Sequence, residues 1–512
     1  MSGITAKRFV VRVDSSEQIG SGHVMRCLTL ANALSTLGGE VLFLCRDLQG
    51  NLIDLIAQQG YEVIRLSVPS AKSIDFTWCQ HANWLEVDWE LDARETRQIL
   101  QQRGGCDWLI VDHYALGRSW ETSLKGSYGQ LMVVDDLADR PHDCDLLLDQ
   151  NLYANMQERY EGLVPKGCRQ LLGPKYALLR EEFSRARKRL PSPPDEVRRL
   201  LVFFGNADPG DETGKVLQVL SLPRYSHLTV DVVVGAMNPR RDRIRDLCAG
   251  HEHLKFHCQV NNLAELMVSA DLAVAAGGAT TWERCCLGLP SLVVSVALNQ
   301  QELSRHGAES GLFHYLGGAE EVSCEDYAAA LATFTSKAEN LRGFSTRGKE
   351  LVDGQGASRV CVAMSPPAIQ LRPAVEGDCE AIYTWRNAED TRRYIFDARP
   401  IPLETHRQWY QRAMENPDRI LLIGELDGKA VGVLRYDVTG DEAMVSIFLV
   451  PGTSGKGVGT QLIRAGSTWL AKHRSEVFII NAEILGENLA SQIAFARAGY
   501  RLHYLTYREE RS

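Results

Sequence analysis

Residues 20–26 read Gly20-Ser21-Gly22-His23-Val24-Met25-Arg26 and connect a short apolar run, residues 9–13, to a helical pattern that begins near His23. Where a strand passes directly into a helix, the first N–H groups of the helix lack partners and favour an anion such as a phosphate. The glycines beside Ser21 let the backbone approach a ligand closely. This stretch predicts a general base, His23, next to a nucleotide diphosphate. An ordinary helix start with an incidental histidine is the alternative interpretation of these seven residues.

The pattern around this stretch extends to about residue 187 as apolar runs that alternate with helical stretches. The expected strands are residues 9–13, 41–45, 63–66, 108–111, 131–134 and 145–148, with helices such as 24–36 and 51–59 between them. Continuous apolar strands separated by helices predict a parallel sheet covered on both faces. Sheets of this kind bind ligands at the carboxyl ends of their strands.

Polar side chains follow three of these expected strands. His23 comes after the first strand, Asp112-His113-Tyr114 after the fourth, and Asp135-Asp136 after the fifth. One polar cluster is ordinary in a loop, whereas three at one edge of a sheet indicate a lined cleft. We therefore expect this edge of the sheet to carry the function.

A second alternating region follows the proline-rich residues 191–194, which predict an interdomain linker. Its expected strands are residues 199–204, 228–234, 254–257, 272–275 and 291–296. After residues 272–275 come Gly277-Gly278 and Thr280-Thr281, a second helix start suited to phosphate, and Glu283 is placed to accept from ribose hydroxyls. A tight turn with Thr280 as N-cap is the alternative. Neither glycine cluster matches GxGxxG or GxxxxGK[ST], which disfavours a dinucleotide dehydrogenase and an ATPase.

Length and composition limit the possible functions. A chain of 512 residues is expected to form about three domains. The net charge of −9 is spread over interspersed acids and bases, which argues against nucleic acid as a partner. No segment approaches the ~20 apolar residues that span a bilayer, and residues 1–7 lack the apolar stretch of a secretory signal. We expect a cytoplasmic enzyme that acts on small molecules and has no membrane partner.

The 13 cysteines include no CxxC pair, and we expect them to be reduced and mostly buried. His251, His253, His257 and Cys258 superficially resemble metal ligands. However, no second ligand pair lies at structural-zinc spacing, so no metal is expected.

Residues 354–367, rich in glycine and proline, indicate another boundary, and the remaining residues are enough for one small domain. Its expected strands are residues 369–371, 420–426, 430–437, 444–450 and 477–482. After residues 444–450 comes Pro451-Gly452-Thr453-Ser454-Gly455-Lys456-Gly457-Val458-Gly459-Thr460, followed by a helical pattern. A strand, a glycine-rich loop and a helix in this order predict a pyrophosphate cradle.

Two Rossmann-like domains in tandem resemble the GT-B architecture of nucleotide-sugar enzymes. Motifs in order from about residue 8 to residue 360 resemble the UDP-sugar hydrolases of pseudaminic acid biosynthesis. These motifs are Arg12-Val13-Asp14-Ser15-Ser16, residues 20–27, Asp112-His113-Tyr114, Asp135-Asp136, residues 178–183, residues 277–283 and Asn299-Gln300. Residues 203–206, Phe-Phe-Gly-Asn, depart from the Gly-Gly that relatives often carry, so the contacts of that loop stay open.

The resemblance implies hydrolysis of UDP-2,4-diacetamido-2,4,6-trideoxy-β-L-altropyranose to the free sugar and UDP, without a metal. It implies that His23 is the catalytic base that activates water for attack on the anomeric carbon. The substrate and UDP would be bound by Gly20, Ser21, Gly22, Tyr114, Gly277, Gly278, Thr280, Thr281, Glu283, Asn299 and Gln300. Because UDP is a leaving group that needs little protonation, one base and N–H groups on the diphosphate would be sufficient.

The C-terminal loop resembles motif A of the GNAT acetyltransferases, and Asn488-Leu489-Ala490-Ser491 with Phe495 and Gly499-Tyr500 resembles a later motif of that family. The resemblance implies that acetyl-CoA is held by Gly455, Lys456, Gly457, Gly459, Thr460 and Asn488. Ser454 replaces the usual Gln or Arg, and Phe495 stands where many members have a tyrosine acid. The general acid is therefore unassigned, with water or Tyr500 as candidates, and the general base stays open among Glu442, Asp437 and Ser446.

The sequence as a whole predicts a bifunctional α/β enzyme of GT-B class followed by an α+β GNAT domain. The expected domains are residues 8–190, 195–362 and 367–512. The second activity would be N-acetylation of the 4-amino group of a UDP-amino sugar, the preceding step of the same pathway. The alternatives are a GT-B glycosyltransferase and a hydrolase with a non-catalytic GNAT scaffold.

Overall fold

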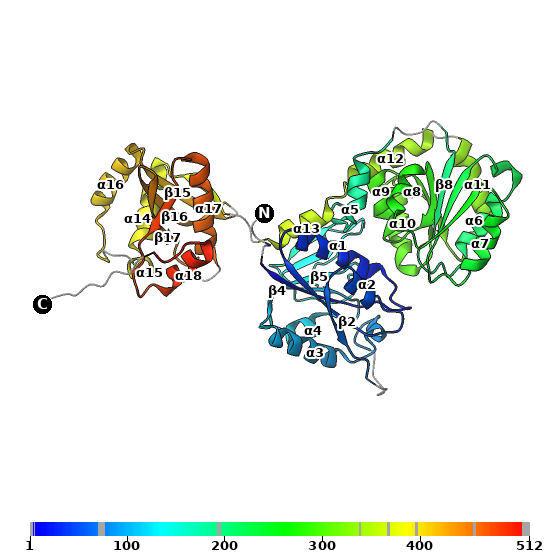
Figure 1. Cartoon of the computed structure of the whole chain (residues 1–512), viewed down its shortest axis with the longest axis horizontal. Coiled ribbons are helices and arrows are strands. Elements are labelled where there is room, and N and C mark those ends of the chain that lie inside the picture. Colours follow the sequence, from blue (N-terminus) through cyan, green and yellow to red (C-terminus); the bar gives the residue numbers. More distant parts are fainter. Residues whose placement is uncertain are drawn as a thin grey trace. The chain divides into compact units, whose positions relative to one another are not determined.

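The computed structural model describes residues 4, 6–69, 77–191, 196–336, 339–365, 369–394, 398–426, 428–453 and 457–503. The chain forms two compact units, Met1–Ser365 and Pro366–Ser512 (Figure 1). Within the described ranges, no helix is both long and apolar enough to cross a membrane.

The first lobe of unit Met1–Ser365 contains a parallel sheet, which has seven strands within the described residues in the order β3-β2-β1-β4-β5-β6-β7. These strands are β1 (Arg8–Val13), β2 (Glu40–Arg46), β3 (Glu62–Leu66), β4 (Cys106–Asp112), β5 (Tyr128–Val134), β6 (Leu146–Asp149) and β7 (Arg169–Leu172). The strand order reverses between β1 and β4, where Val13 pairs with Asp112. This switch point is where ligands of parallel sheets bind.

Helices cover both faces of this sheet, because its strands are apolar on both sides. They are α1 (Gly22–Thr36), α2 (Ile53–Gln58), η1 (Ala82–Leu85), α3 (Trp89–Gln102), α4 (Arg118–Ser123) and η2 (Pro174–Tyr176). The next helix, α5 (Glu181–Arg187), instead packs on helices of the second lobe, where its Phe183 is buried. Figure 1 shows α1 on one face and α3 and α4 on the other, and separate buried clusters lie under each.

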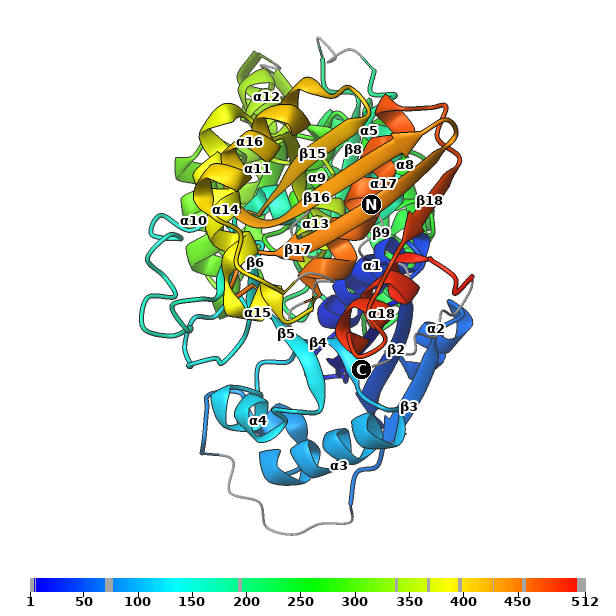
Figure 2. The same ribbon diagram turned by 90° about the vertical axis from the view of Figure 1, so that its left-hand side faces the viewer.

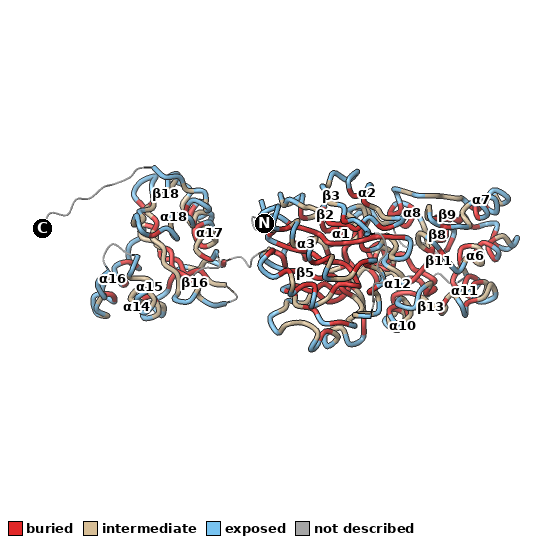
Figure 3. The backbone as a smooth tube through the Cα atoms, turned by 90° about the horizontal axis from the view of Figure 1, so that it is seen from below, coloured by how far each residue is buried: buried red, intermediate tan, exposed pale blue. Residues whose placement is uncertain are grey.

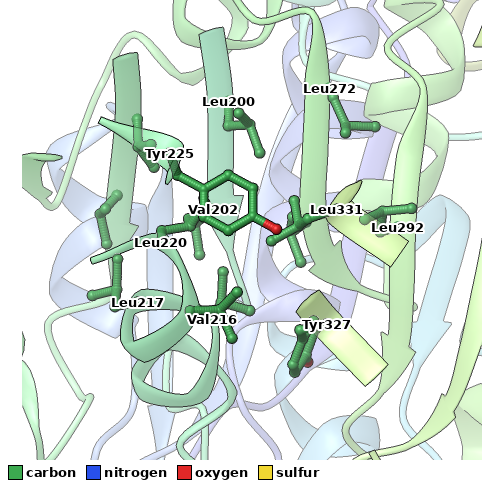
Figure 4. Packing of buried hydrophobic residues seen from close by; sticks show 14 of the residues in the cluster. Leu200, Val202, Val216, Leu217, Leu220, Tyr225, Leu272, Leu292, Tyr327 and Leu331 are labelled. Carbon is green, nitrogen blue, oxygen red and sulfur yellow. The ribbon is translucent and has the colours of Figure 1, made fainter. Parts of the chain in front are cut away.

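The second lobe repeats the architecture with another parallel sheet, in the order β10-β9-β8-β11-β12-β13 among the described residues. Its strands are β8 (Arg199–Phe203), β9 (Thr229–Val234), β10 (Leu254–Cys258), β11 (Leu272–Ala276), β12 (Ser291–Ser295) and β13 (His314–Gly318). Figure 4 shows Leu200, Val202 and Leu272 of this sheet packed with Leu217 and Leu331 from two covering helices. The switch point here lies between β8 and β11.

The helices of the second lobe are α6 (Glu212–Leu220), η3 (Pro223–Tyr225), α7 (Arg241–Ala249), α8 (Leu263–Ser269), α9 (Thr280–Leu287), η4 (Leu298–Gln300), α10 (Gln301–Glu309), α11 (Cys324–Ser336) and α12 (Glu339–Leu351). A last helix, α13 (Gly356–Met364), returns to the first lobe. Its Val360 and Met364 are buried in the cluster under α1, and the Met364 carbonyl accepts from Trp108 Nε1 at 3.1 Å. The sequence interval 195–362 places most of α13 with the second domain, whereas its apolar face packs against the first sheet.

Unit Pro366–Ser512 contains a mixed sheet in the order β14-β15-β16-β17-β18 (Figure 2). Its strands are β14 (Gln370–Pro373), β15 (Arg419–Leu426), β16 (Lys429–Thr439), β17 (Glu442–Leu449) and β18 (Ile479–Ala482). Its helices are η5 (Glu376–Asp378), α14 (Cys379–Asn387), α15 (Glu389–Arg392), α16 (Leu403–Glu415), α17 (Val458–His473) and α18 (Leu489–Ala498). The described pairs are antiparallel except β17 with β18, which is parallel.

Buried residues follow the central strands of each sheet, and exposed residues lie on the outer helices and loops (Figure 3). The apolar runs of the sequence therefore form the cores that they predicted. The predicted fold class, two Rossmann-like lobes in tandem followed by an α+β domain, is confirmed.

Candidate active site

The turn between β1 and α1 leaves the N-terminus of α1 open. Gly20 has a φ of +79°, which favours glycine, and its N–H donates to Ser16 O at 2.9 Å. Ser21 precedes the helix without a side-chain capping bond, and the first turn carries no acidic residue. A Cβ added to Gly20 or Gly22 would meet nothing within 4 Å. The amides of this turn are thus placed to receive an anion.

His23 lies in the first turn of α1, with its side chain 9% exposed. Its Nδ1 lies 2.6 Å from Oδ1 of Asp112, the last residue of β4. Because an ionised carboxylate only accepts, Nδ1 carries the proton and Nε2 has the lone pair. Nε2 makes no hydrogen bond to any residue that the structure describes. His23 therefore has a fixed tautomer with a free basic nitrogen.

Asp112 is fully buried and is held by Arg26 as well as by His23. Arg26 Nε donates to Oδ2 and Arg26 Nη2 to Oδ1, both at 2.6 Å. Burial by itself would raise the pKa of Asp112, but Arg26 and His23 outweigh it and hold the pKa well below its usual range. Asp112 therefore stays ionised, and it can both orient the His23 ring and stabilise its protonated form.

A second carboxylate, Asp136, lies beside this group in the loop after β5. It accepts from Arg26 Nη1 at 3.3 Å, from Asn151 Nδ2 at 3.0 Å and from the Tyr114 hydroxyl. Burial and Asp136 raise the pKa of Tyr114 well above its usual value, so the phenol stays protonated. Since its hydroxyl is used in this bond, Tyr114 meets His23 with its ring, at 4.6 Å between centroids and nearly perpendicular.

Two further rings complete this side of the site. Trp84 of η1 stacks on Tyr114 at 5.4 Å and lies 6.1 Å from the His23 ring, and His81 lies 4.7 Å from Trp84. Neither residue was predicted from the sequence. The sequence could have pointed to them, because both residues follow the third strand of a parallel sheet, and loops after such strands line the ligand site.

The turn between β11 and α9 is the counterpart in the second lobe. A Cβ on Gly277 would lie 2.1 Å from Ser304 Oγ, and one on Gly278 would lie 3.3 Å from Gln300 Nε2, so this turn is closely packed. α9 begins at Thr280 without a side-chain capping bond. The N–H groups of Gly277, Thr281 and Trp282 are bonded to backbone carbonyls, and the remaining amides of the turn are placed to face a phosphate.

A buried guanidinium lies directly behind this second turn. Arg284 donates to Thr280 Oγ1 at 2.9 Å, to Thr281 Oγ1 at 3.2 Å and to Ala276 O at 3.0 Å. Burial lowers the pKa of Arg284 to about 10, so it remains charged at neutral pH. The hydroxyl of Thr281 is buried, whereas Thr280 is half-buried and keeps its O–H free to donate. The charge of Arg284 adds to the helix dipole in favouring an anion.

Glu283, in the first turn of α9, has one carboxylate oxygen 3.6 Å from Arg180 Nη2. Its other oxygen is buried and has no partner among the described residues. Burial outweighs Arg180 and raises the pKa of Glu283 to about 7. An acceptor of this kind suits a ligand hydroxyl, as predicted for ribose.

Hydrogen bonds join the two turns inside unit Met1–Ser365. Trp282 of α9 donates through Nε1 to Asn151 Oδ1 at 3.0 Å, and Asn151 donates in turn to Asp136. The same Asp136 is bound by Arg26, which holds Asp112. Sequence reasoning missed Asn151 and gave no role to Trp282 within the motif 277–283, because their contact joins residues 131 positions apart.

The last predicted substrate residues of this unit are Asn299 and Gln300 in η4. Gln300 Oε1 accepts from Val296 N at 3.1 Å, and its amide lies next to Gly278. Asn299 is exposed, and its side chain makes no hydrogen bond within the described ranges. The structure therefore brings Gln300 to the second turn but does not bring Asn299 into the hydrogen-bonded network.

In the C-terminal unit, the predicted pyrophosphate loop leads into α17. Gly455 and Lys456 lie outside the described residues. Gly457 has a φ of +72° at the N-cap of α17, and Gly459 and Thr460 form its first turn, which carries no acidic residue. The Asn488 side chain caps α18 by accepting from Ser491 N at 3.1 Å, so its carboxamide oxygen is used within the protein.

The sheet opens next to this loop. Pairing between β17 and β18 runs from Glu442 with Ile479 to Val445 with Ala482, whereas β17 continues to Leu449 (Figure 2). Beyond Val445, no described strand pairs with that edge of β17. The exposed edge offers backbone groups to an extended ligand.

The candidate acid and base residues of this unit are all hydrogen-bonded. Asp437 accepts from Arg419 Nε at 2.5 Å, Ser446 accepts from Arg435 Nη2 at 3.1 Å, and Glu442 accepts from Asn481 Nδ2 at 2.9 Å. Tyr500 lies with its hydroxyl 3.3 Å from Ser467 Oγ. These contacts do not single out one acid or base.

Comparisons with known proteins agree with this organisation. Residues 369–501 match the family model described as acetyltransferase (GNAT) domain. The chain is a homologue of the UDP-2,4-diacetamido-2,4,6-trideoxy-beta-L-altropyranose hydrolase of Campylobacter jejuni, with 28% identity over 305 residues that cover 59% of this chain and 97% of that protein. It is 31% identical over 189 residues to the spore coat polysaccharide biosynthesis protein SpsG of Bacillus subtilis, covering 37% of this chain and 56% of that protein.

Among solved structures, MurG of Acinetobacter baumannii is similar, with a TM-score of 0.49 and 12% identity over 70% of this chain and 99% of that chain. The chain thus combines a region homologous to a nucleotide-sugar hydrolase with a GNAT acetyltransferase domain. The resemblances inferred from the sequence motifs are confirmed.

Proposed function

We propose that unit Met1–Ser365 hydrolyses UDP-2,4-diacetamido-2,4,6-trideoxy-β-L-altropyranose to the free sugar and UDP, with His23 as general base. The C-terminal domain acetylates the 4-amino group of the corresponding UDP-amino sugar. The observation that carries the hydrolase proposal is the pair formed by His23 and Asp112, which fixes Nδ1 and leaves Nε2 free beside an open helix N-terminus.

In the proposed reaction, Nε2 of His23 takes a proton from water as the water oxygen attacks the anomeric carbon. The bond from that carbon to the diphosphate oxygen breaks, and the electron pair leaves with UDP. Asp112 stabilises the imidazolium that forms. Amides at the start of α1 and α9, with Arg284 behind the latter, hold the diphosphate, and Glu283 accepts from the ribose. UDP leaves as a stable anion, so the leaving oxygen requires no acid.

The proposed domain limits are residues 8–190, 195–362 and 367–512, with α13 packed on the first lobe. Within them, Gly20, Ser21, Gly22 and Tyr114 form the catalytic side of the site. Gly277, Gly278, Thr280, Thr281 and Gln300 belong to the UDP side through the second turn. Asn299 is exposed, and we propose that it moves inward to the substrate when the ligand binds.

For acetyl transfer, the amides around Gly457, Gly459 and Thr460 fit a pyrophosphate, because this helix start has a positive φ and no acid in its first turn. The unpaired edge of β17 beyond Val445 fits the extended arm of acetyl-CoA. Acetyl-CoA supplies the acetyl group, and the acceptor amine loses a proton as the new amide bond forms and the thiol leaves.

A second candidate for the C-terminal domain is a binding scaffold without catalysis. Phe495 favours it, because this buried ring fills the position where a tyrosine acid would stand. The hydroxyl of Tyr500 does not replace that acid, because it lies within hydrogen-bonding distance of Ser467 in α17.

The test supplies the full chain with the UDP-4-amino sugar, with and without acetyl-CoA, and follows the products by NMR. The proposal predicts the acetylated UDP-sugar and then free diacetamido sugar with UDP, only when acetyl-CoA is present. Accumulation of unchanged amino sugar, when preformed diacetamido substrate is still hydrolysed, would support the scaffold alternative. Release of UDP only after a sugar acceptor is added would instead identify a glycosyltransferase. Residues 1–365 alone serve as the control that hydrolyses without acetylating.

A further inference from the structure

The wall beside His23 is formed by aromatic rings, and the proposed hydrolysis gives no role to two of them, Trp84 and His81. Trp84 and Tyr114 stack with ring centroids 5.4 Å apart and 27° between planes. His81 lies 4.7 Å from Trp84 and 5.4 Å from Tyr114. His23 lies 4.6 Å from Tyr114 and 6.1 Å from Trp84, so a sugar carbon attacked from His23 lies next to this wall.

This wall presents little hydrogen-bonding capacity from Tyr114, because its hydroxyl is bonded to Asp136. Tyr114 is 5% exposed and is stacked by Trp84, so the half-buried Trp84 ring supplies the contact surface. Aromatic faces bind methyl and C–H groups through apolar contact, and a hydroxyl buried against them without a partner costs free energy. The wall thus selects a substituent that ends in an apolar group.

One polar atom in the cluster has no partner. Nδ1 of His81 is buried and makes no hydrogen bond to the residues that the structure describes. Burial lowers the pKa of His81, so the ring is neutral at pH 7 and each nitrogen is either a donor or an acceptor. A buried polar atom without a partner is costly, and a ligand group that pairs with it recovers that cost.

We propose, on the basis of the function proposed above, that His81 and Trp84 form a subsite for an acylamino group on the sugar carbon next to the anomeric carbon. The terminal methyl packs on the Trp84 ring, and the amide pairs with His81 Nδ1. Closeness to His23 assigns the subsite to carbon 2, because that carbon alone is bonded to both the reacting centre and a nitrogen substituent in the proposed substrate. The subsite favours an acylamino group over a hydroxyl at that carbon, because only the acylamino group supplies a methyl group for the Trp84 ring.

The test measures binding by calorimetry in the His23→Ala full chain, so that no ligand is consumed. The ligands are UDP, the diacetamido UDP-sugar, and its analogue with a hydroxyl in place of the acetamido group at carbon 2. We expect the acetamido ligand to bind about tenfold more tightly than the analogue, a ratio typical of one filled apolar pocket. Trp84→Ala reduces the ratio to below about threefold, whereas Trp84→Phe keeps it.

Two variants separate the subsite from general effects on the fold. Trp89→Ala removes another half-buried tryptophan of the same lobe that packs in a different cluster, and it leaves the ratio unchanged. His81→Phe keeps a ring but removes Nδ1, and it lowers the ratio without changing UDP affinity. An unchanged ratio in Trp84→Ala, with UDP affinity intact, overturns the subsite. Failure of the wild-type chain to hydrolyse the diacetamido sugar overturns the proposed function separately, because the binding ratio does not depend on turnover.

Discussion

The two strand-to-helix turns of unit Met1–Ser365 share one backbone design but differ in what lies behind them. Each follows a buried strand at a switch point, contains glycines and opens a helix without a side-chain cap. Behind the first turn are the carboxylates of Asp112 and Asp136, and behind the second is the guanidinium of Arg284. A carboxylate pair suits proton transfer through a histidine, whereas a buried cation suits a bound phosphate.

This difference teaches that a helix N-terminus does not by itself define a role. Backbone geometry makes both turns suitable for an anion, and the buried charge behind each turn assigns the chemistry. Asn151 connects them through Trp282 and Asp136, so the orientation of the second turn bears on the catalytic group of the first. Substitutions at the first turn should therefore change kcat, and substitutions at the second turn should change the affinity for UDP.

The largest expected effect comes from removing the base of the first turn. His23→Ala should lower kcat about 10³-fold, because general-base catalysis contributes roughly 10² to 10⁴. The affinity for UDP should change by less than about threefold, since the diphosphate contacts backbone amides. Steady-state hydrolysis and calorimetry with UDP measure the two quantities. A kcat close to that of the wild type would remove His23 from the mechanism.

The next effect comes from the carboxylate that orients this base. Asp112→Asn keeps the shape but offers an amide, so His23 loses the charged acceptor that fixes its tautomer. Because His23 itself remains, kcat should fall about 10²-fold, the lower end of the contribution of general-base catalysis. KM should change little. The variant leaves the charge of the buried Arg26 less well compensated, which could destabilise the fold. Circular dichroism is therefore the control for folding. A large rise in KM with unchanged kcat would contradict the assigned role of Asp112.

A substitution behind the second turn should change the affinity for UDP. Arg284→Gln removes the buried charge but retains hydrogen bonding to Thr280, and it should weaken UDP binding about tenfold, with kcat at saturation changed by less than about threefold. The comparison between the turns fails if this variant loses kcat as strongly as His23→Ala does while UDP still binds normally.

The smallest effect is a pH dependence of the second turn. Burial raises the pKa of Glu283 to about 7, so its carboxylate form is lost as the pH falls through neutrality. An ionised carboxylate is the stronger acceptor for a ribose hydroxyl, so UDP affinity should fall by a few-fold between pH 8 and pH 6. Calorimetry across this range measures the slope of UDP affinity against pH. Glu283→Gln should flatten it, and an equal slope in both proteins would exclude Glu283 as the titrating group.

Much of the first turn was predictable from sequence, because strand ends can be read from apolar runs and parallel strands place their carboxyl ends at one edge. This reasoning located His23 and Tyr114 and placed Asp112 and Asp136 nearby. It did not assign the partners of His23, because that pairing depends on β1 and β4 lying side by side although they are far apart in the chain.

Other features of the structure could not be predicted from the local sequence pattern. Trp84 lies in the one-turn helix η1, which is too short to show a periodic pattern, and the bond from Trp282 to Asn151 joins two lobes. The return of α13 to the first lobe follows from its apolar face, including Val360, which a boundary drawn from glycines and prolines cannot detect. Arg284 reads as an ordinary helix charge in sequence, and its burial behind the phosphate turn is visible only in three dimensions.

The central claim is that the first turn directs water to the anomeric carbon of a UDP-sugar. Hydrolysis in water enriched with ¹⁸O tests it directly, with the label sought in the β-phosphate of UDP by ³¹P NMR, because the free sugar exchanges its anomeric oxygen with solvent. Attack at carbon breaks the carbon–oxygen bond and leaves UDP with its original oxygen, so the account predicts unlabelled UDP. ¹⁸O in the β-phosphate would show that water attacks phosphorus and would contradict the role assigned to His23.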